Sequence, residues 1–265
     1  MMHENKFYRT ELLLGSTAME RLRSSTVAVF GVGGVGSFTV EALARTGLGH
    51  LILIDHDVVD VTNINRQLHA TTKTLGQSKT ALMKARVLDI NPEARVDTID
   101  EFYLPSDGDK FFIDRYDCVV DATDTVSGKI GLAAECDRRG IPIVSSMGAG
   151  NKLDPTAFRA GDIFDTTVDP IARVMRKKLK ELGIKKLRVV YSTETPKKIS
   201  PARPTFGDKP PYSDSFSKAL LSEPLKGDDA STVERKVIGS ISFVPSVAGL
   251  ILAGEVIKML VSDLL

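Results

Sequence analysis

The chain has 265 residues, of which 42% are hydrophobic and 26% charged, which predicts a globular protein and excludes collagen-like and wholly disordered classes. With 35 Lys and Arg against 34 Asp and Glu, the net charge of +1 neither indicates nor excludes a nucleic-acid partner. Only two cysteines, Cys118 and Cys136, are present, which excludes a disulfide framework and an all-cysteine zinc site. Neither an uninterrupted apolar run of about 18 residues nor a signal-peptide core is visible, so we expect no membrane contact and a cytoplasmic setting.

Strand and helix patterns alternate through the first 150 residues. Short apolar runs predict buried strands at 26–31, 51–54, 96–99, 118–120 and 141–145. Helical patterns separate them at 34–46, 78–90 and 127–139, and Asn91-Pro92 stops the second helix. This alternation predicts an α/β fold, with a Rossmann-like, doubly wound, mostly parallel sheet and helices on both faces.

The rest of the chain has a different character. We predict strands at 158–164 and 187–191, a basic helix at 169–182 and a final apolar helix at 246–260. Residues 195–236 are rich in proline and lack periodicity, which indicates a long mobile loop. We therefore expect one domain over 1–265, made of two halves at 1–150 and 151–265.

The strongest local signal is the turn Gly31-Val-Gly33-Gly34-Val-Gly36, which follows a predicted strand and opens a predicted helix. Glycines let the backbone approach phosphates, and the helix N-terminus offers free N–H groups. Asp55 ends the next strand, where a carboxylate can accept hydrogen bonds from ribose hydroxyls. The pattern predicts a nucleotide site without distinguishing a dinucleotide from ATP. The alternative is a plain strand–helix turn.

Charged residues near this turn favour a triphosphate. Arg66 and Lys79 could reach back over the glycines, and two cations suit a triphosphate whose charge must be neutralised during attack. Taken singly, each is better interpreted as a solvated surface residue. Asp124 follows the fourth strand and is a candidate Mg²⁺ ligand, although Asp124 or Thr125 could equally cap the next helix.

Four stretches, GVGGVGS, LILIDHDVVDVTNINRQLHA, GQSK and VVDATDT, resemble the ATP-binding fold of the ubiquitin-activating and molybdopterin-synthase-adenylating superfamily. That superfamily uses ATP and Mg²⁺ to adenylate a carboxylate. Arg9 resembles an arginine that enters the ATP site from the other subunit of a homodimer. The resemblance implies ATP contacts from Gly31, Gly33, Gly34, Gly36, Asp55, Asp57, Asn63, Arg66, Lys79 and Asp124, with Asp124 as the metal ligand.

The stretches SSMGAGNKLDPT, TVDPIARVMRKKLK, YSTETP and FVPSVAGLILAG are similar to the tRNA threonylcarbamoyladenosine dehydratases. This resemblance implies an enzyme that adenylates the carboxylate of threonylcarbamoyladenosine beside the anticodon and closes a ring, releasing AMP and pyrophosphate. The half 1–150 would then bind ATP and the half 151–265 would face tRNA. The predicted catalytic groups are Arg66, Lys79, Asp124 and Arg9. A monovalent cation and a sulfur-transfer protein partner are left open.

Two other functions are weighed against this one. An adenylyltransferase for a ubiquitin-like sulfur carrier commonly has zinc-binding Cys-x-x-Cys pairs and often a catalytic cysteine, which this chain lacks, so we expect no zinc. Cys118 and Cys136 fall within a strand and a helix and are interpreted as buried packing thiols. A catalytically silent nucleotide-binding module is disfavoured by the presence of Arg66, Lys79 and Asp124.

A local excess of positive charge offers separate support for an RNA substrate. Residues 171–188 hold eight Lys and Arg and one Glu, a net charge of +7 in a chain of +1. Such a helix could follow an RNA backbone, although a solvated helix face is the alternative. The predicted tRNA contacts are Arg173, Arg176, Lys177, Lys178, Lys185 and Lys186.

Overall fold

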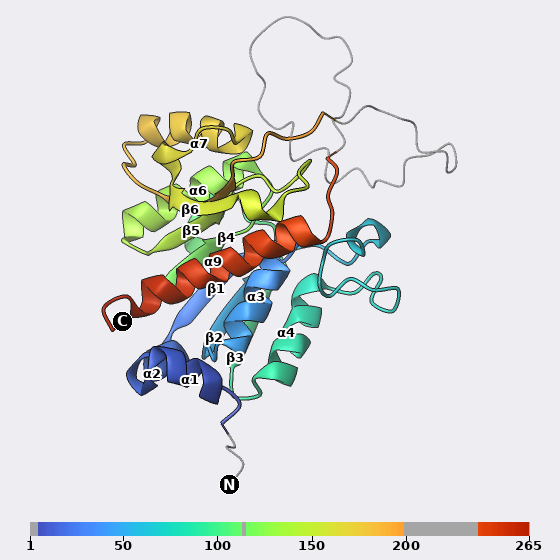
Figure 1. Ribbon diagram of the computed structural model, residues 1–265, viewed down its shortest axis with the longest axis vertical. Helices are drawn as coiled ribbons and strands as arrows, with labels where there is room; N and C mark the ends of the chain where they lie inside the picture. Colours follow the sequence, from blue (N-terminus) through green and yellow to red (C-terminus); the bar gives the residue numbers. More distant parts are fainter. Residues whose placement is uncertain (1–4, 113–114, 199–237, 265) are drawn as a thin grey trace, which may run out of the picture.

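A seven-stranded sheet forms the centre of the computed structural model, which describes residues 5–112, 115–198 and 238–264 (Figure 1). The strand order is β3-β2-β1-β4-β5-β7-β6, and all neighbours are parallel except β6, which runs antiparallel to β7. The predicted Rossmann-like, mostly parallel sheet is confirmed. The strands are β1 (Thr26–Phe30), β2 (His50–Ile54), β3 (Arg95–Ile99), β4 (Cys118–Asp121), β5 (Ile143–Ser146), β6 (Phe158–Asp162) and β7 (Arg188–Ser192).

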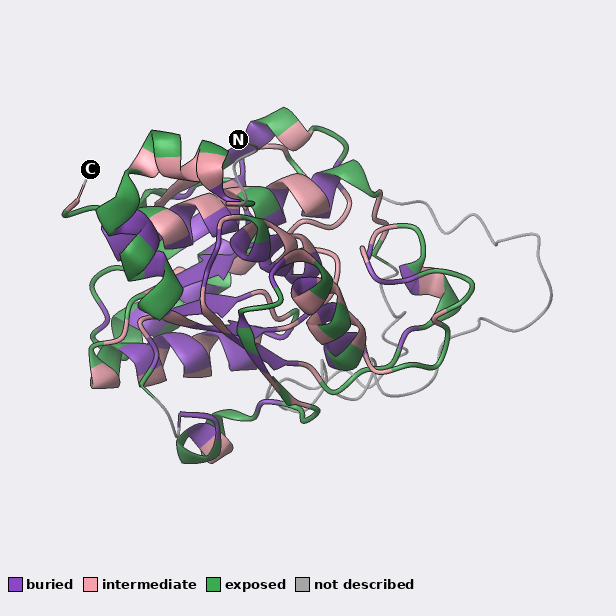
Figure 2. Ribbon diagram, turned by 90° about the horizontal axis from the view of Figure 1, so that it is seen from below, coloured by how far each residue is buried: buried purple, intermediate pink, exposed green. Residues whose placement is uncertain are grey.

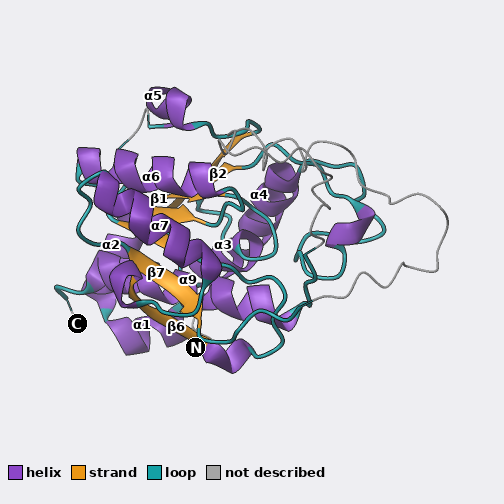
Figure 3. Ribbon diagram, turned by 90° about the horizontal axis from the view of Figure 1, so that it is seen from above, coloured by secondary structure: helices purple, strands orange, loops and turns teal. Residues whose placement is uncertain are grey.

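Helices cover both faces of this sheet (Figure 3). They are α1 (Tyr8–Leu14), α2 (Ser16–Ser24), α3 (Gly36–Arg45), α4 (Lys79–Ile90), α5 (Gly108–Phe111), α6 (Val126–Arg139), α7 (Pro170–Glu181) and α9 (Phe243–Val261). Short 3₁₀ turns occur at η1 (Val61–Asn63), η2 (Pro105–Asp107), η3 (Pro155–Ala157) and η4 (Ile163–Asp165).

The central strands are buried on both faces, as their apolar runs predict (Figure 2). Along β1, Val27 and Val29 face the core shared with α3, α4 and α9. Ala28 and Phe30 face the opposite core, where the Phe30 ring lies 5.2 Å from the Tyr103 ring, edge to face. Fully burying a valine or phenylalanine side chain contributes about 1.5–3 kcal/mol, so these contacts fix the strands that carry the loops at the ends of the sheet.

The last helix, α9, lies across α3 in the core. The carbonyl of Gly249 accepts a hydrogen bond from Thr39 Oγ1, and a Cβ at Gly249 would lie 2.3 Å from the Val35 carbonyl oxygen. By length and hydropathy α9 could cross a membrane, but 56% of its most apolar window is buried inside the fold. We therefore interpret α9 as a core helix. It begins three residues before the predicted start because Pro245 fits its first turn, where no N–H partner is needed.

Three other features differ from the sequence prediction or lie beyond it. Two short helices, α1 and α2, precede β1 although no helix was predicted there. The predicted strand at 158–164 ends at Asp162, whose side chain accepts a hydrogen bond from the Phe164 amide and starts η4. The predicted loop 195–236 falls, after its first four residues, outside the described residues and stays a prediction.

Candidate active site

The glycine turn lies where the winding of the sheet reverses. The chain runs outward from β1 to β2 and β3, then returns to place β4 on the other side of β1. In open α/β sheets, ligands bind at such a reversal, outside the carboxyl ends of the strands. Gly31 follows β1 and Asp121 ends β4, so both border this crevice. The topology therefore places the predicted nucleotide turn at the expected binding edge.

Close packing explains the glycines of this turn. Gly31 has a φ of +87°, and a Cβ there would lie 2.6 Å from the Ala122 carbonyl oxygen. A Cβ at Gly36 would lie 1.9 Å from the Gly31 carbonyl oxygen. A Cβ at Gly34 would press against Pro245 at 3.4 Å, while Gly33 has more room. Side chains at Gly31 and Gly36 would push the turn away from the end of the sheet. Glycines at these two positions therefore allow the turn to pack closely against the start of the loop after β4 and the start of α3.

The two acids that follow β2 have different roles in this fold. Asp55 Oδ2 accepts a hydrogen bond of 2.7 Å from the Val32 amide, and its Oδ1 accepts one from the Asp57 amide. Asp55 thus fixes the glycine turn while keeping lone pairs for a ribose. Asp57 Oδ2 lies 2.7 Å from Lys79 Nζ. Lys79 is only 4% exposed, which rules out a solvated surface lysine and makes it a preorganised charge at the crevice.

Arg66 is held by the short turn that begins at η1. Asn63 Oδ1 accepts a hydrogen bond from the Asp60 amide, so the buried Asn63 stabilises this turn. Arg66 Nη1 donates to the Thr62 carbonyl and to Asn65 Oδ1, at 2.8 and 2.9 Å. A Cβ at Gly34 would lie 3.3 Å from Arg66 Cγ, so the arginine stem runs beside the glycine turn.

Asp124 completes a set of three carboxylates near the crevice. Asp124 is exposed at the surface, but the protein around it still removes part of the water that would solvate its charge. This desolvation is the main reason that the pKa of Asp124 is raised, and repulsion from Asp57 and Asp55 raises it further. Thr125, rather than Asp124, is the N-cap of α6, and it makes no side-chain capping bond. Carboxylate oxygens are preferred Mg²⁺ ligands, and a cation would relieve this repulsion, so the donor set fits Mg²⁺.

A buried ion pair, missed by the sequence analysis, lies beneath the crevice. Lys129 Nζ on α6 lies 3.3 Å from both carboxylate oxygens of Asp121 and donates to the Ser146 carbonyl at 2.6 Å. Ser145 Oγ and Thr123 Oγ1 also donate to Asp121. The pair joins the ends of β4 and β5, and the Asp that ends β4 was the only sequence signal for it.

A second buried pair holds the turn after β5. Lys152 Nζ lies 3.0 Å from Asp169 Oδ2 and also donates to the Gly148 carbonyl. Asp169 Oδ1 accepts hydrogen bonds from the Ile171 and Ala172 amides, so it also caps α7. The small residues that follow β5 therefore form a turn that is fixed to α7.

His69 is a further buried polar group near Lys79. Both of its ring nitrogens lack hydrogen-bond partners within the described residues, and the side chain is 6% exposed. Burial lowers the His69 pKa to about 4, with the Lys79 charge acting in the same direction. The imidazole is therefore neutral at pH 7. Neither periodicity nor spacing singles it out in the sequence.

Comparison with known proteins now identifies the family. The ThiF family model matches residues 8–263. The chain belongs to this family. It is 46% identical over 266 residues to a tRNA threonylcarbamoyladenosine dehydratase of Bacillus subtilis, covering 100% of this chain and 97% of that protein. This similarity over the full length places it among the dehydratases of the ThiF family.

Solved structures agree with that placement. A crystal structure of the Escherichia coli tRNA N6-threonylcarbamoyladenosine dehydratase in complex with ATP superposes with a TM-score of 0.79, at 32% identity, covering 97% of this chain and 94% of that chain. An Arabidopsis thaliana adenylyltransferase and sulfurtransferase is 36% identical over 154 residues, but covers only 57% of this chain and 33% of its own length. The full-length match therefore favours the dehydratases over carrier-activating members of the ThiF family.

Arg9 does not join the crevice of its own chain. It lies exposed on α1, and α2 leads from α1 to the amino end of β1 (Figure 1). The crevice is at the carboxyl end of the same strand. In this ThiF family member, a role for Arg9 at an ATP site therefore requires a second subunit.

The predicted tRNA-binding residues are spread along the second half of the chain. Arg173 lies in the first turn of α7, near the crevice, and is exposed with Lys177. Lys185 and Lys186 lie between α7 and β7, at the amino ends of the strands. Arg176 is hydrogen-bonded to Thr166 Oγ1 and Lys178 is paired with Glu181 at 3.3 Å. The six residues thus form no single cluster, and their role stays a prediction.

The two cysteines are packing residues, as predicted. Both are fully buried, Cys118 in β4 and Cys136 in α6. Burial raises the pKa of the Cys118 thiol to about 12 and raises that of Cys136 as well. A thiolate is the nucleophilic form, so neither side chain is poised to attack an acyl group.

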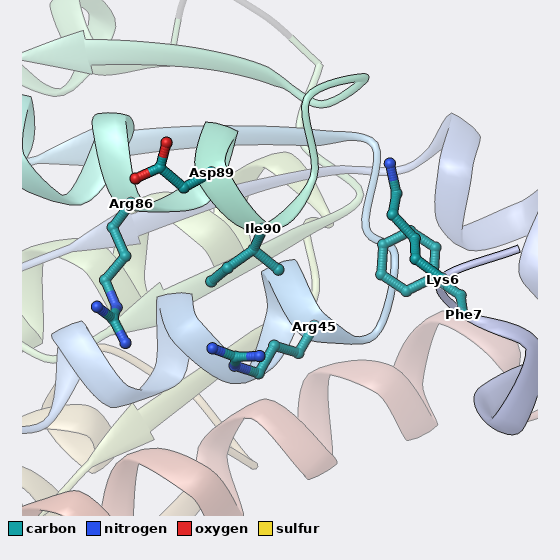
Figure 4. A pocket seen from close by; sticks show the side chains of 6 residues that line it. All are labelled: Lys6, Phe7, Arg45, Arg86, Asp89 and Ile90. Atoms are coloured by element: carbon teal, nitrogen blue, oxygen red, sulfur yellow. The ribbon is translucent and has the colours of Figure 1, made fainter. Parts of the chain in front are cut away.

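A cavity of about 490 Å³ lies away from the crevice, where α3 and α4 end (Figure 4). Three of the side chains around it are cations, but each is paired. Arg45 and Arg86 both contact Glu41, at 2.8 and 2.6 Å, and Lys6 contacts Glu93. Among the described residues, the three cations are balanced by Glu41, Glu93 and Asp89, so we assign this cavity no part in phosphate binding.

Proposed function

We propose that this chain is an ATP-dependent tRNA threonylcarbamoyladenosine dehydratase. The observation that carries the proposal is the buried Lys79, held by Asp57, together with Arg66 beside the glycine turn at the reversal of the sheet. The chain also matches these dehydratases along its length. This arrangement suits a triphosphate better than a dinucleotide, because loop amides alone can hold a pyrophosphate.

The proposed reaction has two steps, adenylation of the modified base by ATP and closure of the ring. A carboxylate oxygen of the threonylcarbamoyl group attacks the α-phosphorus, the bond to the β-phosphate oxygen breaks, and pyrophosphate leaves. Lys79 and Arg66 stabilise the charge on that leaving group. A nucleophile within the same side chain then attacks the acyl carbon and gives up its proton, AMP leaves, and a ring is closed. The net change to the base is the loss of water.

Ring closure needs no nucleophile from the protein. Attack within one side chain gains the proximity advantage, worth about 7–11 kcal/mol in well-oriented intramolecular reactions. Both thiols are buried and protonated, which agrees with a route free of a thioester. Asp124, with Asp55 and Asp57 nearby, is the residue that would hold Mg²⁺. That ion would neutralise phosphate charge when bound.

The proposal includes a homodimer in which Arg9 of each subunit completes the partner's ATP site. Mixing Arg9→Ala protein with Lys79→Ala protein would then leave one intact site in each mixed dimer, and about half of the mixed dimers' sites would be active. Activity measured after verified subunit exchange should therefore recover. No recovery would contradict the shared site.

The decisive test compares two acceptors. Purified protein should release AMP from ATP only when tRNA carrying threonylcarbamoyladenosine is present, and nucleoside mass spectrometry should show the cyclic product. Carrier-dependent ATP–pyrophosphate exchange without tRNA-dependent AMP release would instead favour the sulfur-carrier adenylyltransferase. Adding a sulfur-transfer protein or K⁺ to the same assay tests the two components left open. The proposed setting is the cytoplasm, where tRNA is modified.

A further inference from the structure

Asn151 joins two segments that lie far apart in the chain. Its amide donates to the Gly239 carbonyl at 2.8 Å, and its Oδ1 accepts from the Gly239 amide at 2.6 Å. Its carbonyl accepts a further hydrogen bond, 2.7 Å long, from the Lys197 amide. The chain near residue 197 and the chain near residue 239 are therefore both fixed to the turn after β5. In Figure 1 the segment near residue 239 leads directly into the start of α9.

The backbone of Asn151 is strained in a way that suits this role. Its φ of +59° makes it the one non-glycine residue with positive φ among the described residues. Asn tolerates this region better than most residues, but it still adopts it only when surrounding contacts require it. The neighbouring Gly150 packs closely against the returning segment, because a Cβ there would lie 2.3 Å from Ile238 Cγ2.

Asn65 links the segment at Gly239 and Ser240 to Arg66, the arginine proposed to contact the phosphates. Its Nδ2 donates to the Ser240 carbonyl at 3.0 Å, and its Oδ1 accepts from Arg66 Nη1 at 2.9 Å. Gly239 and Ser240 are consecutive, so one continuous path runs from Arg66 through Asn65 to Asn151. Arg66 is the one residue of this path for which the sequence predicted a role.

We propose that Asn65 and Asn151 are positioning residues that tie the alignment of Arg66 to the turn after β5. Arg66 acts on the phosphates, and the turn after β5 borders the crevice that receives the acyl acceptor. The path therefore makes the phosphate contact sensitive to the state of the acceptor side. This coupling rests on the proposed ATP-dependent function, but its test does not require turnover.

Hydrogen exchange with and without ATP tests the path directly. In the wild type, ATP should slow amide exchange in the glycine turn and also at Asn151 and Gly239. Asn65→Asp keeps the acceptor for Arg66 and loses the donor to Ser240, so ATP should still protect the glycine turn but no longer Asn151 and Gly239. The matched control Gln77→Glu makes the same amide-to-carboxylate change on a side chain that donates to the Lys73 carbonyl, and it should behave as wild type.

Kinetics supply a second measurement. Asn151→Gly relieves the positive φ and removes only the side-chain acceptor, so the fold should be kept. Loss of one neutral hydrogen bond should lower kcat for tRNA-dependent AMP release about threefold to tenfold, with the KM for ATP within about twofold of wild type. Adding Asn65→Asp should cause little further loss, because both changes interrupt one path.

The outcomes separate this inference from the proposed function. Protection of the glycine turn without protection of Asn151 and Gly239 in the wild type would overturn the coupling and leave ATP binding intact. Unchanged long-range protection in Asn65→Asp, or kinetic losses that multiply in the double variant, would also overturn it. A glycine turn that gains no protection from ATP would contradict the ATP assignment itself.

Discussion

The two ends of the sheet differ in how deeply their ion pairs are buried. At the carboxyl end, Lys79, Lys129 and Lys152 are almost fully buried, each against a single aspartate. At the amino end, Lys6 and Arg45 are paired with glutamates but remain substantially exposed. Burying an ion costs several kcal/mol, and its pairing rarely returns the whole amount. The carboxyl end of the sheet therefore carries a desolvation cost that the amino end avoids.

The largest expected effect is on stability at the carboxyl end. Lys129→Met leaves the buried Asp121 carboxylate without its cation and should lower the free energy of unfolding by about 3–5 kcal/mol. The same change at the amino end, Lys6→Met, breaks an exposed pair and should cost less than about 1 kcal/mol. Urea unfolding of both variants measures the difference. Equal losses in the free energy of unfolding would contradict the proposed difference between the buried and the exposed ion pairs.

The next effect concerns activity. Lys79→Ala should lower kcat/KM for tRNA-dependent AMP release about a hundredfold or more, because a preorganised charge at the leaving group is lost. Its stability should change less, since the partner Asp57 is half-exposed and can be hydrated. Arg86→Ala, at the far end of the same helix, should keep activity within about twofold. A Lys79→Ala enzyme with wild-type activity would remove this lysine from the phosphate site.

The contrast between the ends also explains what the sequence could predict. Apolar runs located the central strands, and the glycine turn was correctly placed between the first strand and the following helix, because both features depend on neighbouring residues. The buried state of Lys79 and Lys129 could not be predicted, since each depends on an element that folds over it. The Asn151–Gly239 hydrogen bonds join residues 88 positions apart. The α2 helix is short and is held by the burial of Ala18, Met19 and Leu22, because tertiary packing rather than helix propensity stabilises helices of that length.

A smaller effect should separate the cations near the crevice from those at the amino end. Arg173→Glu with Lys177→Glu alters exposed residues on α7, whereas Lys185→Glu with Lys186→Glu alters residues at the opposite end. If α7 follows the RNA backbone, the first pair should lower the log–log salt slope of tRNA binding by about 1.4–1.8, two contacts at 0.7–0.9 each. Filter binding at several salt concentrations measures the slope. ATP affinity should not change, and equal slopes for both pairs would argue against a contact confined to the crevice end.

The smallest effect is the pH response of the crevice carboxylates. The pKa of Asp124 is raised in the folded state by desolvation and by Asp57 and Asp55, so the folded protein binds a proton there more readily than the unfolded chain. Its contribution then makes the metal-free protein less stable as pH rises through the ordinary aspartate range and into that of the raised pKa. Asp124→Asn should remove this dependence and raise metal-free stability at pH 7 by less than about 1 kcal/mol, since the carboxylate is exposed. Thermal unfolding measured with and without Mg²⁺ between roughly pH 4, the ordinary pKa of an aspartate, and about pH 7 reports the stability that Asp124 contributes at each pH. If Mg²⁺ raises the Tm of the wild type and not of Asp124→Asn, the carboxylate is a ligand, and if it raises both equally, the ion binds elsewhere.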